Sequence, residues 1–197
     1  MLFQSKAQNN KEIDSLLNLL KTETVDTATI RYKIQISELL HRTYPDSALK
    51  FIDEAHITAK RNDIHSFDAK IMYSYGNIYA AINDYKKSID FYLKSRMLGD
   101  SIYSSNPEDI INLEELANIN NSIGVLYFTL NDYDNALKYY EESLSNIEEM
   151  YSIDSGYVKI ENKISVINNI GGIYLQNNEL DRSLEYFKKG LEVLEKN

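Results

Sequence analysis

The chain has 197 residues, with 30 Asp and Glu against 21 Lys and Arg, which gives a formal net charge of −9. Such a surface repels phosphate backbones, so we expect no nucleic acid as a partner. The absence of Cys excludes thiolate metal sites, and only 2 Pro and 7 Gly leave few turns for an all-β fold. No run of 18 apolar residues occurs, so we expect no membrane insertion by this segment.

The first 24 residues predict a segment separate from the rest of the chain. Residues 13–20 have the apolar spacing of a short amphipathic helix, which would cap a helical array. Upstream, Ser5-Lys6-Ala7 fits the small-x-Ala pattern that precedes a signal-peptidase site, and an ordinary chain terminus is the alternative interpretation. The sequence therefore leaves the compartment open between cytoplasmic and extracytoplasmic (periplasmic).

Three segments of the chain align with one another without gaps. Each carries a Gly and, three residues later, a Tyr: Gly76 and Tyr79, Gly124 and Tyr127, Gly171 and Tyr174. Behind each follows a second helical pattern, in which small, apolar and aromatic residues recur over 88–92, 136–140 and 183–187. A fainter upstream copy has its second-helix positions at Ala48, Leu49, Ile52 and Ala55. Such self-similarity is the signature of a helical repeat protein.

The copies also show how each pair of helices would be built. Gly on the first helix lets the second approach closely, where a Cβ would collide, and the Tyr fills the space between the two helices. The sequences Asn83-Asp84 and Asn131-Asp132 predict the turn between the helices, with Asp as the N-cap of the second helix. Residues 177–179 take that place in the last copy.

These motifs resemble the tetratricopeptide repeat. The resemblance implies an all-α fold, a right-handed α-α superhelix of about four helix pairs. It also implies a protein-interaction module with no catalytic activity and no cofactor. We expect an N-terminal segment at 1–24 and an array over 25–197, with approximate repeats 26–62, 63–103, 107–152 and 154–197.

The period is longer than usual for this family. Gly76 and Gly124 are 48 residues apart and Gly124 and Gly171 are 47 apart, against an ordinary repeat of about 34. We therefore expect long helices, including one near 132–152 and one near 157–177, and a break from Gly99 to Pro107. The long helices resemble the sensor segments of bacterial signalling regulators, which implies a bacterial source and a signalling role.

No catalytic or metal-binding constellation is found in the sequence. The three histidines, His41, His56 and His65, lack the HExxH spacing, and neither GxxxxGK[ST] nor GxSxG occurs. Acidic pairs such as Glu141-Glu142 are adjacent on predicted helices and point about 100° apart, so they do not share a proton. We therefore predict no catalytic residues and no metal ligands.

Charge separates the two helices of each predicted pair. Residues 71–83, 116–131 and 164–178 contain no Asp, Glu, Lys or Arg, yet they are rich in Asn, a poor helix former. An Asn amide both donates to and accepts from a peptide backbone, so ligand binding is one interpretation. The alternatives are hydrogen bonds between neighbouring turns, codon bias, or packing against another part of the full-length protein.

In this family the first helix of each pair lines a groove, and the resemblance carries specific positions over to this chain. The predicted ligand-binding residues are Tyr73, Asn77, Asn118, Asn121, Val125, Phe128, Asn168, Leu175 and Gln176. Lys70, Ala81, Thr129, Ser165 and Gly172 lie at further groove positions. Val125, Phe128 and Leu175 would form an apolar pocket for one anchoring side chain. The expected partner is a protein or peptide segment of low net charge; the alternative function is an assembly scaffold that mediates oligomerisation without a discrete ligand.

The last predicted helix has an apolar stripe wider than one partner helix needs. The stripe consists of Leu180, Leu184, Phe187, Leu191 and Leu194. Solenoid repeats bury a face only against a neighbour, so part of the stripe is left for a further repeat, a homodimer partner or a crystal neighbour. We expect the native protein to continue beyond Asn197.

Overall fold

The computed structural model describes residues 2–106, 109–154, 156 and 159–195, and every regular element in these ranges is a helix. The helices are α1 (Leu2–Thr22), α2 (Asp26–Leu40), α3 (Pro45–Arg61), the 3-10 helix η1 (His65–Phe67), α4 (Asp68–Ala81), α5 (Tyr85–Ser105), α6 (Ile110–Thr129), α7 (Tyr133–Ile153), α8 (Ile160–Gln176) and α9 (Leu180–Glu195). The predicted all-α fold is confirmed, with four helix pairs after α1; the repeat bounds given above stay a prediction.

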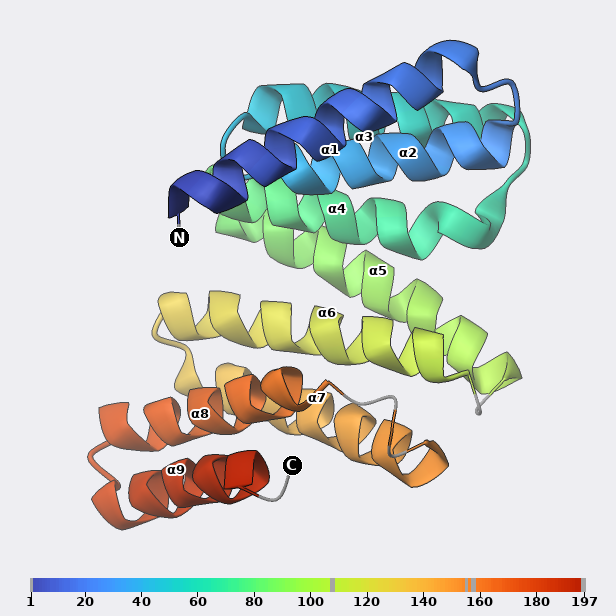
Figure 1. Ribbon diagram of the computed structural model, residues 1–197. Helices are drawn as coiled ribbons and strands as arrows, with labels where there is room; N and C mark the ends of the chain where they lie inside the picture. Colours follow the sequence, from blue (N-terminus) through green and yellow to red (C-terminus); the bar gives the residue numbers. More distant parts are fainter. Residues whose placement is uncertain (1, 107–108, 155, 157–158, 196–197) are drawn as a thin grey trace. The chain divides into compact units, whose positions relative to one another are not determined.

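The chain divides into two compact units, and the first is Met1–Ser95. In this unit α2 and α3 form one pair, and α1 packs on α2 (Figure 1). The core contains Ile30, Ile52 and Ile71, whose side chains are fully buried. Helix α1 begins at Leu2 and so extends well beyond the short helix expected at 13–20.

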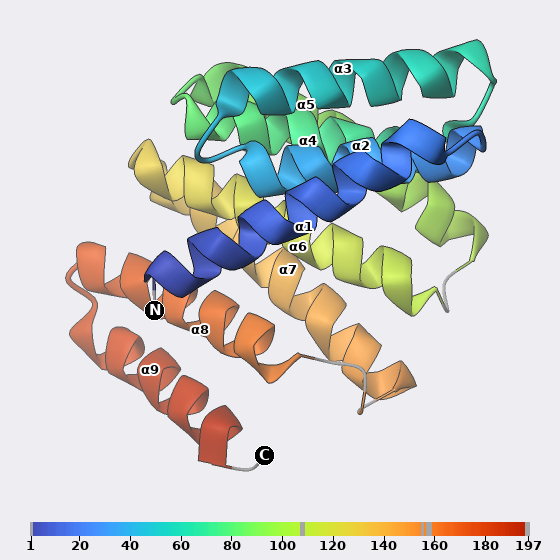
Figure 2. The same cartoon turned by 45° about the horizontal axis from the view of Figure 1, so that its top comes forward.

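The second unit is Arg96–Asn197. Helices α6 and α7 form one pair and α8 and α9 another, and α8 also packs on α7 (Figures 1 and 2). Leu113, Tyr140, Ile147 and Ile170 lie in the core of this unit. Helix α7 agrees closely with the helix expected at 132–152, and α8 lies within the helix expected at 157–177, of which 157 and 158 are outside the described residues.

The three repeated glycines are contact points between the two helices of each pair. A Cβ on Gly76 would lie 2.4 Å from the Tyr92 ring, and a Cβ on Gly124 would lie 2.6 Å from the Tyr140 ring. The equivalent distance for Gly171 is 2.9 Å, to the ring of Phe187. The predicted role of these glycines, close approach of the second helix, is confirmed.

The turns between paired helices use the predicted Asn-Asp pattern. Asn83, Asn131 and Asn178 adopt left-handed φ values of 62°, 60° and 61°, a conformation that Asn tolerates better than most residues. Asp132 then accepts a hydrogen bond from the backbone N–H of Asn135 at 3.2 Å, as an N-cap does. The local sequence thus determines where the first helix of a pair ends and the second begins.

The break predicted from Gly99 to Pro107 begins later than expected, after α5 ends at Ser105. Helix α5 continues through Gly99 to Ser105, and Gly99 is buried at a contact with α6. A Cβ at this position would lie 2.8 Å from Cδ2 of Leu116, and the Gly99 carbonyl accepts a hydrogen bond from Nδ2 of Asn112 at 3.0 Å. This Gly allows helices to pack closely instead of ending one.

Candidate binding site

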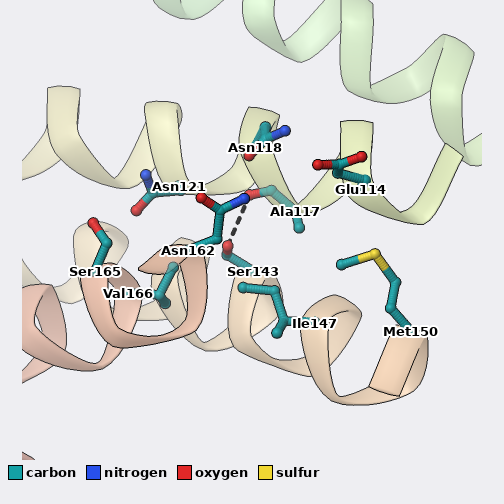
Figure 3. A pocket seen from close by; sticks show the side chains of 10 residues that line it. All are labelled: Glu114, Ala117, Asn118, Asn121, Ser143, Ile147, Met150, Asn162, Ser165 and Val166. Atoms are coloured by element: carbon teal, nitrogen blue, oxygen red, sulfur yellow. Dashed lines mark hydrogen bonds between the residues drawn. The ribbon is translucent and has the colours of Figure 1, made fainter. Parts of the chain in front are cut away.

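A small pocket lies in the second unit where α6, α7 and α8 meet (Figure 3). Its volume is about 50 Å³. Pockets for drug-sized ligands occupy at least about 300 Å³, so this one has room for a few waters or the end of one side chain. The lining residues are Glu114, Ala117, Asn118, Asn121, Ser143, Ile147, Met150, Asn162, Ser165 and Val166.

The lining combines polar side chains from α6 and α8, the first helices of their pairs, with apolar side chains from α6, α7 and α8. Glu114, Asn118 and Asn121 follow one another at helical spacing, which places them along one face of α6. Asn162 and Ser165 come from α8 in the same way, as Figure 3 shows. Ala117, Ile147, Met150 and Val166 supply the apolar part. The arrangement suits a side chain that is apolar along its length, next to amides that hydrogen bond to peptide groups.

The one acidic residue of the lining is paired. Oε1 of Glu114 accepts a hydrogen bond from Nζ of Lys159 at 2.9 Å, and the Glu114 side chain is largely buried. This ion pair leaves amide and hydroxyl groups as the other polar groups of the pocket.

Ser143 helps to build the pocket. Its fully buried Oγ donates a hydrogen bond to the carbonyl of Ala117 at 2.7 Å, drawn as a dashed line in Figure 3. The first unit contains the same contact, in which Ser95 donates to the carbonyl of Ala69 at 2.7 Å. Both bonds join the second helix of a pair to the first.

Three of the predicted groove positions, from two helices, are brought together in the pocket, but Asn121 is paired with Asn169, which was not among the predicted groove residues. Nδ2 of Asn169 donates a hydrogen bond to Oδ1 of Asn121 at 3.0 Å, whereas Asn168 is exposed next to Gly190 of α9. Asn118, Asn121 and Ser165 line the pocket together. Sequence reasoning missed Asn169, although it had named hydrogen bonds between neighbouring turns as an alternative.

The remaining predicted positions of the second unit lie outside the pocket lining. Val125, Leu175 and Gln176 are exposed, and Phe128 is half-buried with its ring 5.6 Å from that of Tyr133. Their role as ligand contacts stays a prediction.

Tyr73 and Asn77 lie in the first unit and help to join α4 to α5. Oη of Tyr92 donates a hydrogen bond to Oδ1 of Asn77 at 2.6 Å, and the rings of Tyr73 and Tyr92 are 5.4 Å apart. Asn77 thus has a structural partner within its own helix pair.

The histidines have local structural roles. Nδ1 of His41 lies 2.6 Å from the carbonyl of Glu38, and burial lowers the pKa of His41. Burial also lowers the pKa of His56. His65 is exposed, and hydrogen bonds to Asp68 and Asp63 raise its pKa.

In the ranges that the structure describes, no three His, Asp or Glu side chains are grouped as metal ligands, and no helix is long and apolar enough to cross a bilayer.

Comparison with known proteins supports the repeat interpretation. Two family models, both described as tetratricopeptide repeat, match residues 115–196 and 69–95. A search among curated proteins found no match.

Solved structures share the fold at low sequence identity. BtubC (BKLC) from P. vanneervenii is similar with a TM-score of 0.74 and 14% identity, over 96% of this chain and 74% of that one. MamA gives a TM-score of 0.59 and 18% identity, over 98% and 92% of the two chains. A putative kinesin light chain from Podosopora anserina with TPR-like repeats gives a TM-score of 0.55 and 11% identity, over 98% of this chain and 90% of that one.

Proposed function

Because the chain belongs to the tetratricopeptide repeat family, we propose that it is a non-catalytic protein- or peptide-binding module, the sensory or interaction part of a bacterial signalling regulator. The family match and the shared fold support an interaction scaffold, and they indicate no enzyme family. The long helices α5, α6 and α7, of 21, 20 and 21 residues, support the resemblance to regulator sensor segments.

The pocket between α6, α7 and α8 is the observation that carries the proposal. It places Asn118, Asn121 and Ser165, three predicted groove positions, around an apolar interior. A side chain of the ligand enters this interior while its backbone bonds the amides. Because Glu114 is already paired with Lys159, the site favours a segment of low net charge, whose affinity depends weakly on salt.

An assembly scaffold without a discrete ligand is the second candidate function. The exposed leucines of α9 favour it, because large apolar side chains on one helix face are typical of contacts between proteins. The two functions differ in whether filling the pocket changes binding.

A peptide library displayed on phage and selected on the purified chain tests the proposal. Ser165→Trp fills the pocket from its edge, and Ser145→Trp, at an exposed position of α7 outside the lining, is the matched control. Circular dichroism first checks that both variants remain folded. We expect enriched peptides of low net charge that lose at least about tenfold in affinity on Ser165→Trp and little on the control.

Two outcomes contradict the proposal. One is that no peptide is enriched; the other is that the enriched peptides bind Ser165→Trp as well as the unchanged chain. If light scattering then shows that the chain forms an oligomer, the assembly-scaffold function replaces the peptide-binding function.

A further inference from the structure

The outer face of α9 carries a row of exposed leucines. Leu184, Leu191 and Leu194 are 53%, 60% and 62% exposed, and their spacing of seven and three residues places them on one stripe. Figures 1 and 2 show α8 directly alongside α9 in the second unit. The preceding helix pair shows what covers such a stripe.

Helix α7 carries the equivalent residues 47 positions earlier, the distance from Gly124 to Gly171. These residues, Leu137, Leu144 and Ile147, are half-buried or buried, and Ile147 is only 2% exposed. Ile147 lies in one core cluster with Val166 and Ile170 of α8. An amphipathic helix therefore covers this face of α7.

Three polar contacts hold α8 on the α6–α7 pair. Nζ of Lys159 lies 2.9 Å from Oε1 of Glu114, and Nζ of Lys163 lies 3.7 Å from Oε1 of Glu148. The third contact is the hydrogen bond from the Asn169 amide to Asn121. The α6–α7 pair supplies the acceptor in each case, and α8 supplies two cations and one amide.

The α8–α9 pair carries the same acceptors. Adding 47 to Glu114, Asn121 and Glu148 gives Glu161, Asn168 and Glu195. All three are exposed, as are the leucines between them. The α8–α9 pair therefore has the same apolar stripe and the same polar acceptors that the α6–α7 pair uses to bind α8. In the α8–α9 pair these groups are exposed.

We propose that this surface, defined by Glu161, Asn168, Leu184, Leu191, Leu194 and Glu195, docks one amphipathic helix of a partner protein. The helix has an apolar stripe and, near its N-terminus, two basic residues four positions apart, as are Lys159, the N-cap of α8, and Lys163 in its first turn. An amide follows six residues after the second basic residue, in the position of Asn169. This docking surface is separate from the pocket and does not depend on the proposed groove ligand.

Charge favours such a partner over a second copy of the chain. In a twofold dimer the same patch meets itself, so each copy would bring the carboxylates of Glu161 and Glu195, together with the exposed Lys188 on the same side of α9, to a patch that is acidic on balance. Like charges opposed at an interface disfavour association. A helix with basic first turns instead pairs with both carboxylates.

A peptide of residues 159–178 is the probe, because α8 is the helix that the equivalent face binds. A lactam between Asn168→Glu and Gly172→Lys keeps it helical; no atom lies within 4 Å of a Cβ added at Gly172. A second peptide carries Lys159→Glu and Lys163→Glu. Each is labelled with fluorescein, and its binding to the full chain is measured by anisotropy.

We expect the first peptide to bind and the charge-reversed peptide to bind at least about tenfold more weakly. The double variant Leu191→Gln with Leu194→Gln loses at least about tenfold in affinity. Leu130→Gln, at the exposed C-cap position that follows α6, is the matched control and leaves binding unchanged. Chains with Glu161→Lys and Glu195→Lys bind the charge-reversed peptide in preference, a reversal that unfolding cannot produce.

The proposal is overturned if the first peptide does not bind, or if its binding is unaffected by the double leucine variant. It is also overturned if light scattering shows a dimer that Leu191→Gln dissociates, because the occupant is then a second copy. A longer chain that continues beyond Asn197 and no longer binds the peptide would overturn it as well, because a further repeat of the same chain is then the occupant. If this docking proposal fails, the proposed peptide-binding function of the pocket still stands, because Ser165→Trp tests the pocket alone.

Discussion

Nδ2 of Asn169 on α8 donates a hydrogen bond to Oδ1 of Asn121 on α6, over 3.0 Å, and so joins two successive helix pairs. Both residues are half-buried. Asn120 instead joins the two helices of one pair, because its amide lies 3.4 Å from Oδ1 of Asn146 on α7. Part of the asparagine enrichment on the first helices therefore has a structural cause, in addition to any contact with a ligand.

The bond between Asn121 and Asn169 predicts coupled effects on stability. Asn121→Ala and Asn169→Ala should each lower the free energy of unfolding by about 1 kcal/mol, the net contribution of one hydrogen bond. Because each variant removes the same bond, the double variant should cost less than the sum of the two by about 0.5–1 kcal/mol. Urea unfolding followed by circular dichroism measures all four chains of the cycle.

Asn168→Ala is the matched control for this cycle. Asn168 is the neighbour of Asn169 but does not contact Asn121 through any hydrogen bond that the described residues show. Combined with Asn121→Ala, it should give additive changes. Additivity for Asn169 as well would contradict the structural role.

Substitution by alanine is expected to have opposite effects on stability at Gly124 and at Gly172, which follows the repeat equivalent of Gly124. Gly124→Ala introduces a Cβ 2.6 Å from the buried ring of Tyr140, and Gly172→Ala introduces one with no atom within 4 Å. The first variant should lose about 1–3 kcal/mol by overpacking. The second should be stabilised by up to about 1 kcal/mol, because Ala is the better helix former.

Midpoints of thermal and urea unfolding compare these two alanine variants directly. Both substitutions bring the same change in helix propensity, so their difference isolates the contact with Tyr140. Equal midpoints would show that the ring moves aside without cost.

The repeated local patterns explain how much of the fold the sequence predicts. Gly124 before Tyr127, and Asn131 before Asp132, each act within one helix pair, so three aligned copies are enough to recognise them. Gly99 has no such copies, and a Gly that ends a helix has the same sequence as one that lets another helix pack on it. Only the contact with Leu116 distinguishes the two.

The candidate site is predicted less well for a related reason. Asn168 and Asn169 are adjacent and point about 100° apart, so a small rotation of α8 decides which of them meets Asn121. That rotation is determined by the packing of apolar residues such as Val166 and Ile170 in the core. The repeat alignment gives the position of a residue along the helix but does not give the rotation of one pair against the next.

His65 predicts a pH-dependent contribution to stability. Hydrogen bonds to Asp68 and Asp63 raise its pKa above the ordinary value of 6.5, so the folded chain binds the proton more tightly than the unfolded chain. The stabilisation is fully present below pH 6.5 and is lost as the pH rises through the raised pKa. It is small, because an exposed ion pair is screened by solvent.

NMR titration of the His65 ring protons measures this pKa directly. We expect it above 6.5, with Asp68→Asn lowering it more than Asp63→Asn, and the pKa of His56 below 6.5. The difference in stability between the unchanged chain and His65→Gln should shrink as the pH rises. A His65 pKa at or below 6.5 would rule out both hydrogen bonds in solution.

Ser143→Ala tests whether the buried hydroxyl holds α6 and α7 together at the pocket. Its Oγ donates to the Ala117 carbonyl at 2.7 Å, so its removal should cost about 1 kcal/mol. No buried donor is left unsatisfied, because the carbonyl belongs to a helix and the hydroxyl is gone.

Ser145→Ala, at an exposed position of the same helix, has the same gain in helix propensity and is the matched control. The difference between the two urea midpoints therefore reports the hydrogen bond alone. If both variants unfold at the same urea concentration, the Ser143 hydroxyl does not stabilise the pair, and the pocket depends on apolar packing by Ile147 and Val166.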